Sequence, residues 1–175
     1  SGHSKGALTA IRQISEMKVN VPMLAMTHCD ASKLAKQHGK KSEYALCAAQ
    51  WHKTLAYKDK FFGNGMQYDK EYNAAFGYTP PYQSAESSAA LLVWKAAFEK
   101  ANSFNTEKVR DALAKTNMQT FYGNIKFSST GQNVAKPMVL FQVRCQGKKC
   151  ENKVVAPTKW ASTKLVHPVP KWSER

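Results

Sequence analysis

The chain has 175 residues, of which 43% are hydrophobic and 22% are charged, and its formal net charge is +14. This length suits a single globular domain with a real core, and the composition excludes an intrinsically disordered chain. No apolar run approaches the roughly 18 residues of a membrane span, so the sequence contains no transmembrane helix.

The first half of the chain alternates predicted helices with short apolar strands. Helical spacing of apolar residues predicts a helix at 5–17, and a short strand is expected at 21–26. Asp30 is a good N-cap for a helix at 31–38 that Gly39 ends, and a second buried strand follows at 44–49. This alternation predicts an α/β fold with a parallel sheet covered by helices.

The second half breaks this alternation. An irregular aromatic stretch at 50–63 is followed by predicted helices at 66–76, 83–101 and 105–115. Tyr68, Tyr72 and Phe76 recur at every fourth position and therefore share one face of the first of these helices. Residues 121–143 then predict a strand, a Gly-bearing turn, a short polar crossing and a second strand, and the tail at 159–175 is expected to be irregular.

The order of the elements at 84–101, 105–115 and 121–143 resembles the C-terminal half of a periplasmic substrate-binding protein of the branched-chain amino acid type. The resemblance extends from about residue 2 to about residue 157. It implies parts of two parallel-sheet lobes of a type I periplasmic binding fold, with the family's N-terminal segment expected to precede Ser1. Residues 1–50 are expected in the C-terminal lobe, 51–136 in the N-terminal lobe, and 137–175 in a return to the C-terminal lobe with the tail.

The resemblance also implies a function. The chain is expected to serve the solute-binding component of an ABC importer, which captures a small molecule, such as an amino acid, between two lobes and docks on a membrane permease. It implies a periplasmic location, no enzymatic activity, no metal and no cofactor. The missing N-terminal segment, or another chain, is expected to complete the lobes, because unpaired sheet edges and uncovered apolar faces favour association.

Six residues are candidates for ligand binding. Thr27 and His28 follow a parallel strand at its C-terminal end, where open α/β sheets bind ligands. By the resemblance, Gln50 and Trp51 stand where the chain crosses between lobes, and Trp51 either walls the cleft or packs the hinge. Tyr82 and Glu86 match the family's ligand-contacting segment. Glu86 either meets a ligand ammonium or only suits the dipole at the start of its helix.

The four cysteines predict one disulfide. Cys145 and Cys150 bracket Gln-Gly-Lys-Lys between two alternating apolar segments, which indicates a hairpin with a four-residue loop and facing side chains. In the oxidising compartment that the resemblance implies, a bridge is favoured over two free surface thiols. Cys29 and Cys47 belong to apolar strands, and buried free thiols are the default expectation for them.

Two other function classes fit parts of the sequence. Residues 2–6, Gly-His-Ser-Lys-Gly, match the nucleophile elbow of the α/β-hydrolases, with Ser4 as nucleophile of an esterase. Only 26 positions separate Ser4 from Asp30, however, which is short for a nucleophile and its acid. The high positive charge would suit a basic nucleic-acid-binding module. The basic residues are dispersed and no nucleic-acid motif accompanies them, so no nucleic-acid partner is expected.

Overall fold

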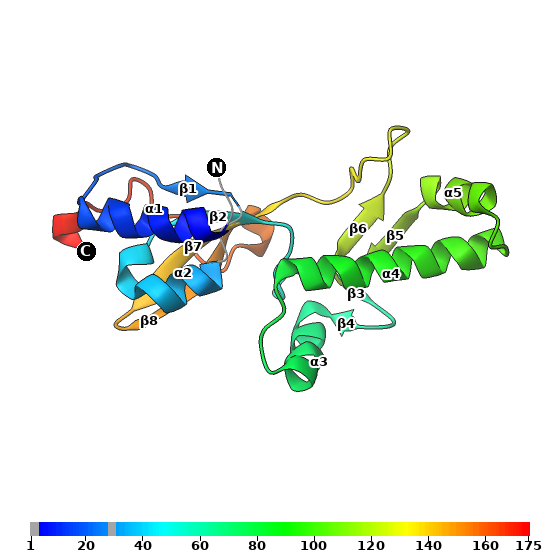
Figure 1. Ribbon diagram of the computed structural model, residues 1–175, viewed down its shortest axis with the longest axis horizontal. Coiled ribbons are helices and arrows are strands. Elements are labelled where there is room, and N and C mark those ends of the chain that lie inside the picture. Colours follow the sequence, from blue (N-terminus) through cyan, green and yellow to red (C-terminus); the bar gives the residue numbers. More distant parts are fainter. Residues whose placement is uncertain (1–3, 28–30) are drawn as a thin grey trace. The chain divides into compact units, whose positions relative to one another are not determined.

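The computed structural model describes residues 4–27 and 31–175 and divides the chain into two units (Figure 1). Unit 1 comprises 1–49 and 138–175, and unit 2 comprises 50–137. These limits lie within one residue of the three segments predicted from the sequence. Their assignment to the two lobes of the family stays a prediction. Among the described residues, no helix combines the length and the apolar character needed to cross a membrane.

Unit 1 is a four-stranded sheet with two helices. In chain order its elements are α1 (Ser4–Glu16), β1 (Ala25–Met26), α2 (Ala31–His38), β2 (Leu46–Ala49), β7 (Val139–Gln146) and β8 (Lys149–Ala156). The strand order is β1-β2-β7-β8, and α2 packs against both α1 and β8 (Figure 1). Ile11 of α1 and Leu34 of α2 are each 1% exposed, so both helices turn apolar residues inward.

The sheet is mixed, although the sequence predicted parallel pairing. β1 and β2 are parallel, as expected from the helix between them, but β2–β7 and β7–β8 are antiparallel. The reason is that β7 enters the sheet from a distant segment and turns directly into β8. Unit 2 also differs, because the strand pairs of its described residues are two short antiparallel hairpins.

The predicted disulfide between Cys145 and Cys150 is present, and the two residues are direct partners in the β7–β8 ladder. The loop between the strands has two residues, not the four predicted, because Gln146 and Lys149 already pair with each other. Gly147 opens this turn at a φ of +59°, a backbone conformation that glycine adopts without strain. Cys47 is also disulfide-bonded, so the expectation of a free thiol there is wrong, whereas Cys29 lies outside the described residues.

Unit 2 is built around a long helix. Its elements are β3 (Lys58–Asp59), β4 (Gly63–Asn64), α3 (Gly65–Phe76), α4 (Tyr82–Ala101), α5 (Thr106–Ala114), β5 (Asn117–Thr120) and β6 (Gly123–Lys126). Asn64 caps α3 through a capping box with Gln67, and Asn105 caps α5. α5 packs on the C-terminal part of α4 through Ala97, Val109 and Ala112.

An aromatic core joins the two hairpins of unit 2 to α3. Phe121, in the turn between β5 and β6, is fully buried and stacks on Tyr68 with 4.2 Å between the ring centroids. The Phe121 amide donates to an Asp59 carboxylate oxygen at 2.6 Å. The other oxygen of Asp59 accepts from the amides of Phe61 and Phe62. One carboxylate thus fixes both the β3–β4 turn and the turn that carries Phe121.

Candidate functional site

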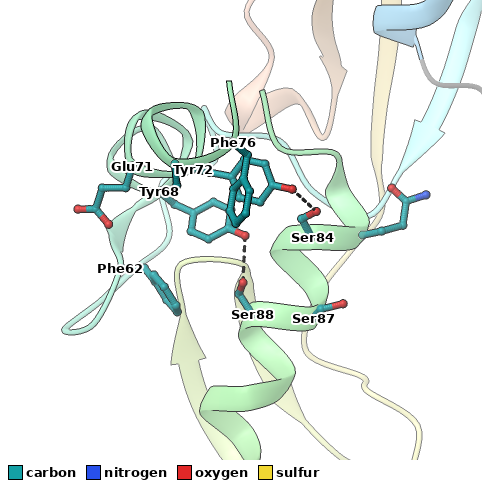
Figure 2. A pocket seen from close by; sticks show the side chains of 10 residues that line it. Phe62, Tyr68, Glu71, Tyr72, Phe76, Ser84, Ser87 and Ser88 are labelled. Carbon is teal, nitrogen blue, oxygen red and sulfur yellow. Dashed lines mark hydrogen bonds between the residues drawn. The ribbon is translucent and has the colours of Figure 1, made fainter. Parts of the chain in front are cut away.

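A pocket of about 520 Å³ lies between α3 and the first half of α4 (Figure 2). Three aromatic residues of α3 form one wall, and three serines of α4 form the other. Its lining residues are Phe62, Tyr68, Glu71, Tyr72, Ala75, Phe76, Gln83, Ser84, Ser87 and Ser88. The aromatic residues of α3 recur at every fourth position, which puts their rings on one face of the helix, as the sequence predicted. This size is within the usual range of small-molecule pockets.

Hydroxyl contacts hold the two walls together. The Tyr68 hydroxyl lies 3.0 Å from Ser88 Oγ, and the Tyr72 hydroxyl lies 3.0 Å from Ser84 Oγ (Figure 2). The Tyr72 hydroxyl also lies 2.9 Å from the Tyr78 hydroxyl. Burial raises the pKa of Tyr68, whereas the hydrogen bond with Ser84 lowers that of Tyr72. Ser87 is left to face the opening. The pocket can therefore hold an apolar or aromatic group against the rings, with a few hydroxyls at its edge.

A second cluster of side chains surrounds Lys136, close to the end of unit 2. Its ammonium lies 4.1 Å from the centroid of the Tyr122 ring and donates a hydrogen bond to the main-chain carbonyl of Gln50. Burial lowers the pKa of Lys136 to about 8, and the Glu86 carboxylate partly opposes this shift. An amine in such a setting is either a structural donor or a functional group, because perturbed lysines are frequent at binding sites.

Tyr122 connects this cluster to α4. Its side chain is buried, which raises its pKa, and the negative charges of Glu86 and Tyr82 raise that pKa further. Glu86 is the fifth residue of α4, and the first turn of this helix has no acidic residue. The position assigned to Glu86 from the sequence, in the first turn, is therefore wrong. Because the helix dipole acts mainly within the first turn, Tyr122 and Lys136 are more relevant to Glu86 than the start of the helix is.

The structure brings together several of the residues predicted from the sequence. The main-chain carbonyl of Gln50 accepts from Lys136, the Glu86 carboxylate opposes the lowering of the Lys136 pKa by burial, and Glu86 and Tyr82 both add to the raised pKa of Tyr122, all within unit 2. Trp51 is only 4% exposed, and its indole donates to the Phe121 carbonyl at 3.3 Å. It also makes edge contacts with the rings of Tyr68 and Phe121. In this structure Trp51 therefore packs the core of unit 2, and its expected role at the cleft or the hinge stays a prediction.

The other predicted residues belong to unit 1. Thr27 is exposed and follows β1 directly, at the C-terminal end of this strand as predicted. His28 lies outside the described residues. Ser4, the nucleophile of the hydrolase alternative, begins α1, while Gly2 and His3 also lie outside the described residues. The nucleophile-elbow interpretation is therefore an untested prediction.

Sequence reasoning missed Lys136 and Tyr122. Lys136 is one of 26 basic residues and belongs to no motif, so no residue-type pattern separates it from the exposed lysines. The only available signal was Gly123, whose missing side chain leaves space for the Lys136 stem. Within the described ranges, 4–27 and 31–175, no three histidine, cysteine, aspartate or glutamate side chains gather in a way that could hold a metal ion.

Comparison with protein families identifies the chain. A model of the periplasmic binding protein family matches residues 3–149, which is most of the sequence. The chain belongs to this family. The resemblance inferred from its helices and its 121–143 segment is thereby confirmed, and a solute-binding role follows at the level of the family.

Solved structures of the same fold include amino acid-binding proteins. The leucine-binding protein LivK of Thermotoga maritima has a TM-score of 0.71 and 21% identity, with 90% of this chain and 44% of that chain covered. A leucine-, isoleucine-, valine-, threonine- and alanine-binding protein of Brucella ovis, in a closed conformation, has a TM-score of 0.73, 14% identity and coverages of 97% and 45%. LivJ of Streptococcus pneumoniae, in complex with isoleucine, has a TM-score of 0.66, 16% identity and coverages of 89% and 43%.

These likenesses confirm the α/β fold of the type I periplasmic binding proteins, and at such identities they show the fold alone. The chain spans less than half the length of each of these three structures. The ligand, the transporter and the partners of the whole protein are therefore proposed and not shown.

Proposed function

We propose that this chain serves the solute-binding component of an ABC importer, which captures an amino acid or a related small molecule in the periplasm and delivers it to a membrane permease. The observation that carries this proposal is the family match over residues 3–149. The names of the related structures, several of which bind branched-chain amino acids, support an amino acid as the first ligand to test. In this proposal the protein binds its ligand and performs no chemistry on it.

Within this function, Glu86 provides the charge that meets a ligand ammonium. Its carboxylate is exposed on α4, and the neighbouring Tyr82 offers an aromatic wall. We expect Gln50 and Trp51, and from the other unit Thr27 and His28, to take part in binding the ligand. Ser87, where relatives are expected to carry a bulky aromatic residue, leaves room for a larger side chain of the ligand.

We further propose that the remainder of the family's fold, in the same protein or in another chain, supplies the rest of the binding surface. The related leucine-binding protein is more than twice as long, and in a two-lobe binding mechanism part of the pocket surface belongs to each lobe. The chain of 175 residues alone is expected to bind its ligand weakly.

The test begins with mass spectrometry of the small molecules released from the protein purified with every segment that its gene encodes. Calorimetric titration with L-leucine and L-isoleucine follows, on that protein and on the 175-residue chain. Glu86→Gln should weaken binding about 10- to 100-fold, because a hydrogen bond to a charged group contributes about 1.5–3 kcal/mol. Glu99→Gln, at an exposed position near the other end of the same helix α4, is the matched control and should bind normally.

Three results would contradict the proposal. The first is equal affinity of the 175-residue chain and the longer protein, which would mean that the rest of the fold is not needed. The second is unchanged affinity in Glu86→Gln, which would remove this residue from the site. The third is stoichiometric labelling of Ser4 by a fluorophosphonate probe, lost in Ser4→Ala, which would favour the hydrolase alternative.

A further inference from the structure

The chain passes between its two units twice, and Lys136 connects these two places. Unit 2 begins at Gln50 and ends at Pro137, so Lys136 is its second-last residue. The Lys136 ammonium donates to the main-chain carbonyl of Gln50, across 86 positions of sequence. This hydrogen bond therefore joins the segment that enters unit 2 to the segment that leaves it.

The lysine stem is held in place over its whole length. A Cβ at Gly123 would lie 2.3 Å from Cδ of Lys136, so the aliphatic stem lies directly on the backbone of this glycine. Gly123 has a φ of +149°, a second reason for glycine here. Beyond the stem, the ammonium lies over the face of the Tyr122 ring, in the geometry of a cation–π contact.

We propose that Lys136 is a positioning residue, a clasp that ties the two crossing segments together at Gln50 and fixes them to the Tyr122–Gly123 turn. The clasp thereby sets the position of the backbone that carries Gln50. The proposal goes beyond the solute-binding role, because the clasp concerns the joints between the units and does not depend on which ligand is bound.

The side-chain chemistry explains why a lysine stands here. A straight, four-carbon stem fits the cradle at Gly123, and the terminal nitrogen provides the donor that the Gln50 carbonyl accepts. Methionine would preserve the stem and lose the donor, which leaves this carbonyl without its partner. The groups that face the amine are Tyr122 of the turn and, from α4, Glu86, with Tyr82 beside Tyr122. A protonated or neutral amine can donate to Gln50 in either case.

The experiment is hydrogen–deuterium exchange of the 175-residue chain, read by mass spectrometry, for the unchanged protein, Lys136→Met and the control Lys126→Met. Lys126 is exposed on β6 of the same hairpin, so its variant repeats the chemical change without the clasp. Peptides with the amides of Leu55 and Val134, which donate to the His52 and Lys126 carbonyls, report on the two crossing segments. We expect at least tenfold faster exchange in these peptides for Lys136→Met, and no change for Lys126→Met or in peptides of β7.

A second measurement separates a clasp from an ordinary stabilising contact. Loss of an ordinary stabilising contact lowers the urea midpoint as well. In Lys136→Met, removal of a buried charge offsets the loss of the hydrogen bond, so the urea midpoint of this variant should not fall. Lys136→Arg, which retains a donor, should exchange more slowly than Lys136→Met. Unchanged exchange in Lys136→Met would overturn the proposal. Faster exchange together with a lower urea midpoint would also overturn it, because that result describes an ordinary stabilising contact.

The unchanged protein provides a test that requires no variant. Brief acetylation with an N-hydroxysuccinimide ester near pH 10.5, followed by peptide mapping, should label Lys136 at least tenfold more slowly than Lys126. At that pH the lowered pKa of Lys136 no longer gives it a large excess of neutral amine, so access of the reagent decides the rate. Labelling of both at the same rate would show that the Lys136 amine is not held at Gln50, whatever the fate of the variants. None of these readouts involves a ligand, so failure of the solute-binding proposal would leave the clasp intact, and the reverse also holds.

Discussion

The stability of unit 2 should rise with pH because Lys136 is buried. Burial lowers the pKa of this lysine from 10.5 to about 8 in the folded protein, while the unfolded chain retains the ordinary value. Between these two values the unfolded chain binds more protons than the folded one. Stability therefore rises as the pH increases through this window, and the folded protein carries the full cost of the buried charge below it.

The magnitude follows from the two pKa values. The complete shift corresponds to about 3 kcal/mol, of which about 2 kcal/mol is regained between pH 7 and about pH 9.5. Because water reaches part of the side chain, we expect a rise of about 1–2 kcal/mol. The pKa of Tyr122 is raised by burial, and its ionisation above pH 10 acts in the opposite direction, so the range must end below that point.

Urea unfolding of the unchanged protein and of Lys136→Met, followed by tryptophan fluorescence at steps of half a pH unit, measures this effect. The titration of all other groups is common to both proteins and cancels in the difference between their free energies of unfolding. The free energy of unfolding of the unchanged protein should therefore increase relative to that of Lys136→Met as the pH rises. A flat difference from pH 7 to pH 9.5 would refute the assignment of a buried, protonated amine to this position.

Three further changes test other parts of the structure. Replacing both Cys145 and Cys150 by serine should lower the free energy of unfolding of unit 1 by about 2 kcal/mol, because a short covalent loop is lost. In the unchanged protein, non-reducing peptide mapping should recover these two cysteines as one linked pair. Asp59→Ala should cost about 2–4 kcal/mol in urea unfolding, since two partly buried amides and one exposed amide lose a charged acceptor, whereas Asp59→Asn should cost less. Asn105→Ala should cost about 1 kcal/mol and fray the start of α5 in exchange experiments, and an unchanged stability would contradict its capping role.

Periodicity and capping were sufficient to predict the helices. α2 has the bounds that Asp30 and Gly39 suggested, and α1, α3 and α4 begin within one residue of their predicted starts. Strands were predicted less well, because their pairing depends on distant partners. The 21–26 segment forms only the two-residue β1, and the antiparallel arrival of β7 beside β2 has no signal in the local pattern.

The candidate site was predictable only in part, for the same reason. Gln50, Tyr82 and Glu86 were found through the order of elements and the family that this order resembles, and the structure brings them to one region of unit 2. Lys136 and Tyr122, which complete this region, approach through the β5–β6 turn and a long irregular crossing. Their burial is a tertiary effect, and the sequence shows only a tyrosine before a glycine and a lysine before a proline.

The same carboxylate serves both proposals, and this affects how they must be tested. Glu86 favours the charged form of Lys136, so an ammonium ligand at Glu86 would compete with the lysine for the carboxylate's field. Glu86→Gln would thus remove the ligand's partner and also make the buried lysine costlier to protonate. A loss of affinity in that variant alone does not separate these two effects. If Glu86 binds the ligand directly, the affinity lost on Glu86→Gln should be the same with Lys136 or Met at position 136. If Glu86 acts only through the lysine, that loss should disappear in the double variant, because the group through which it acts is gone.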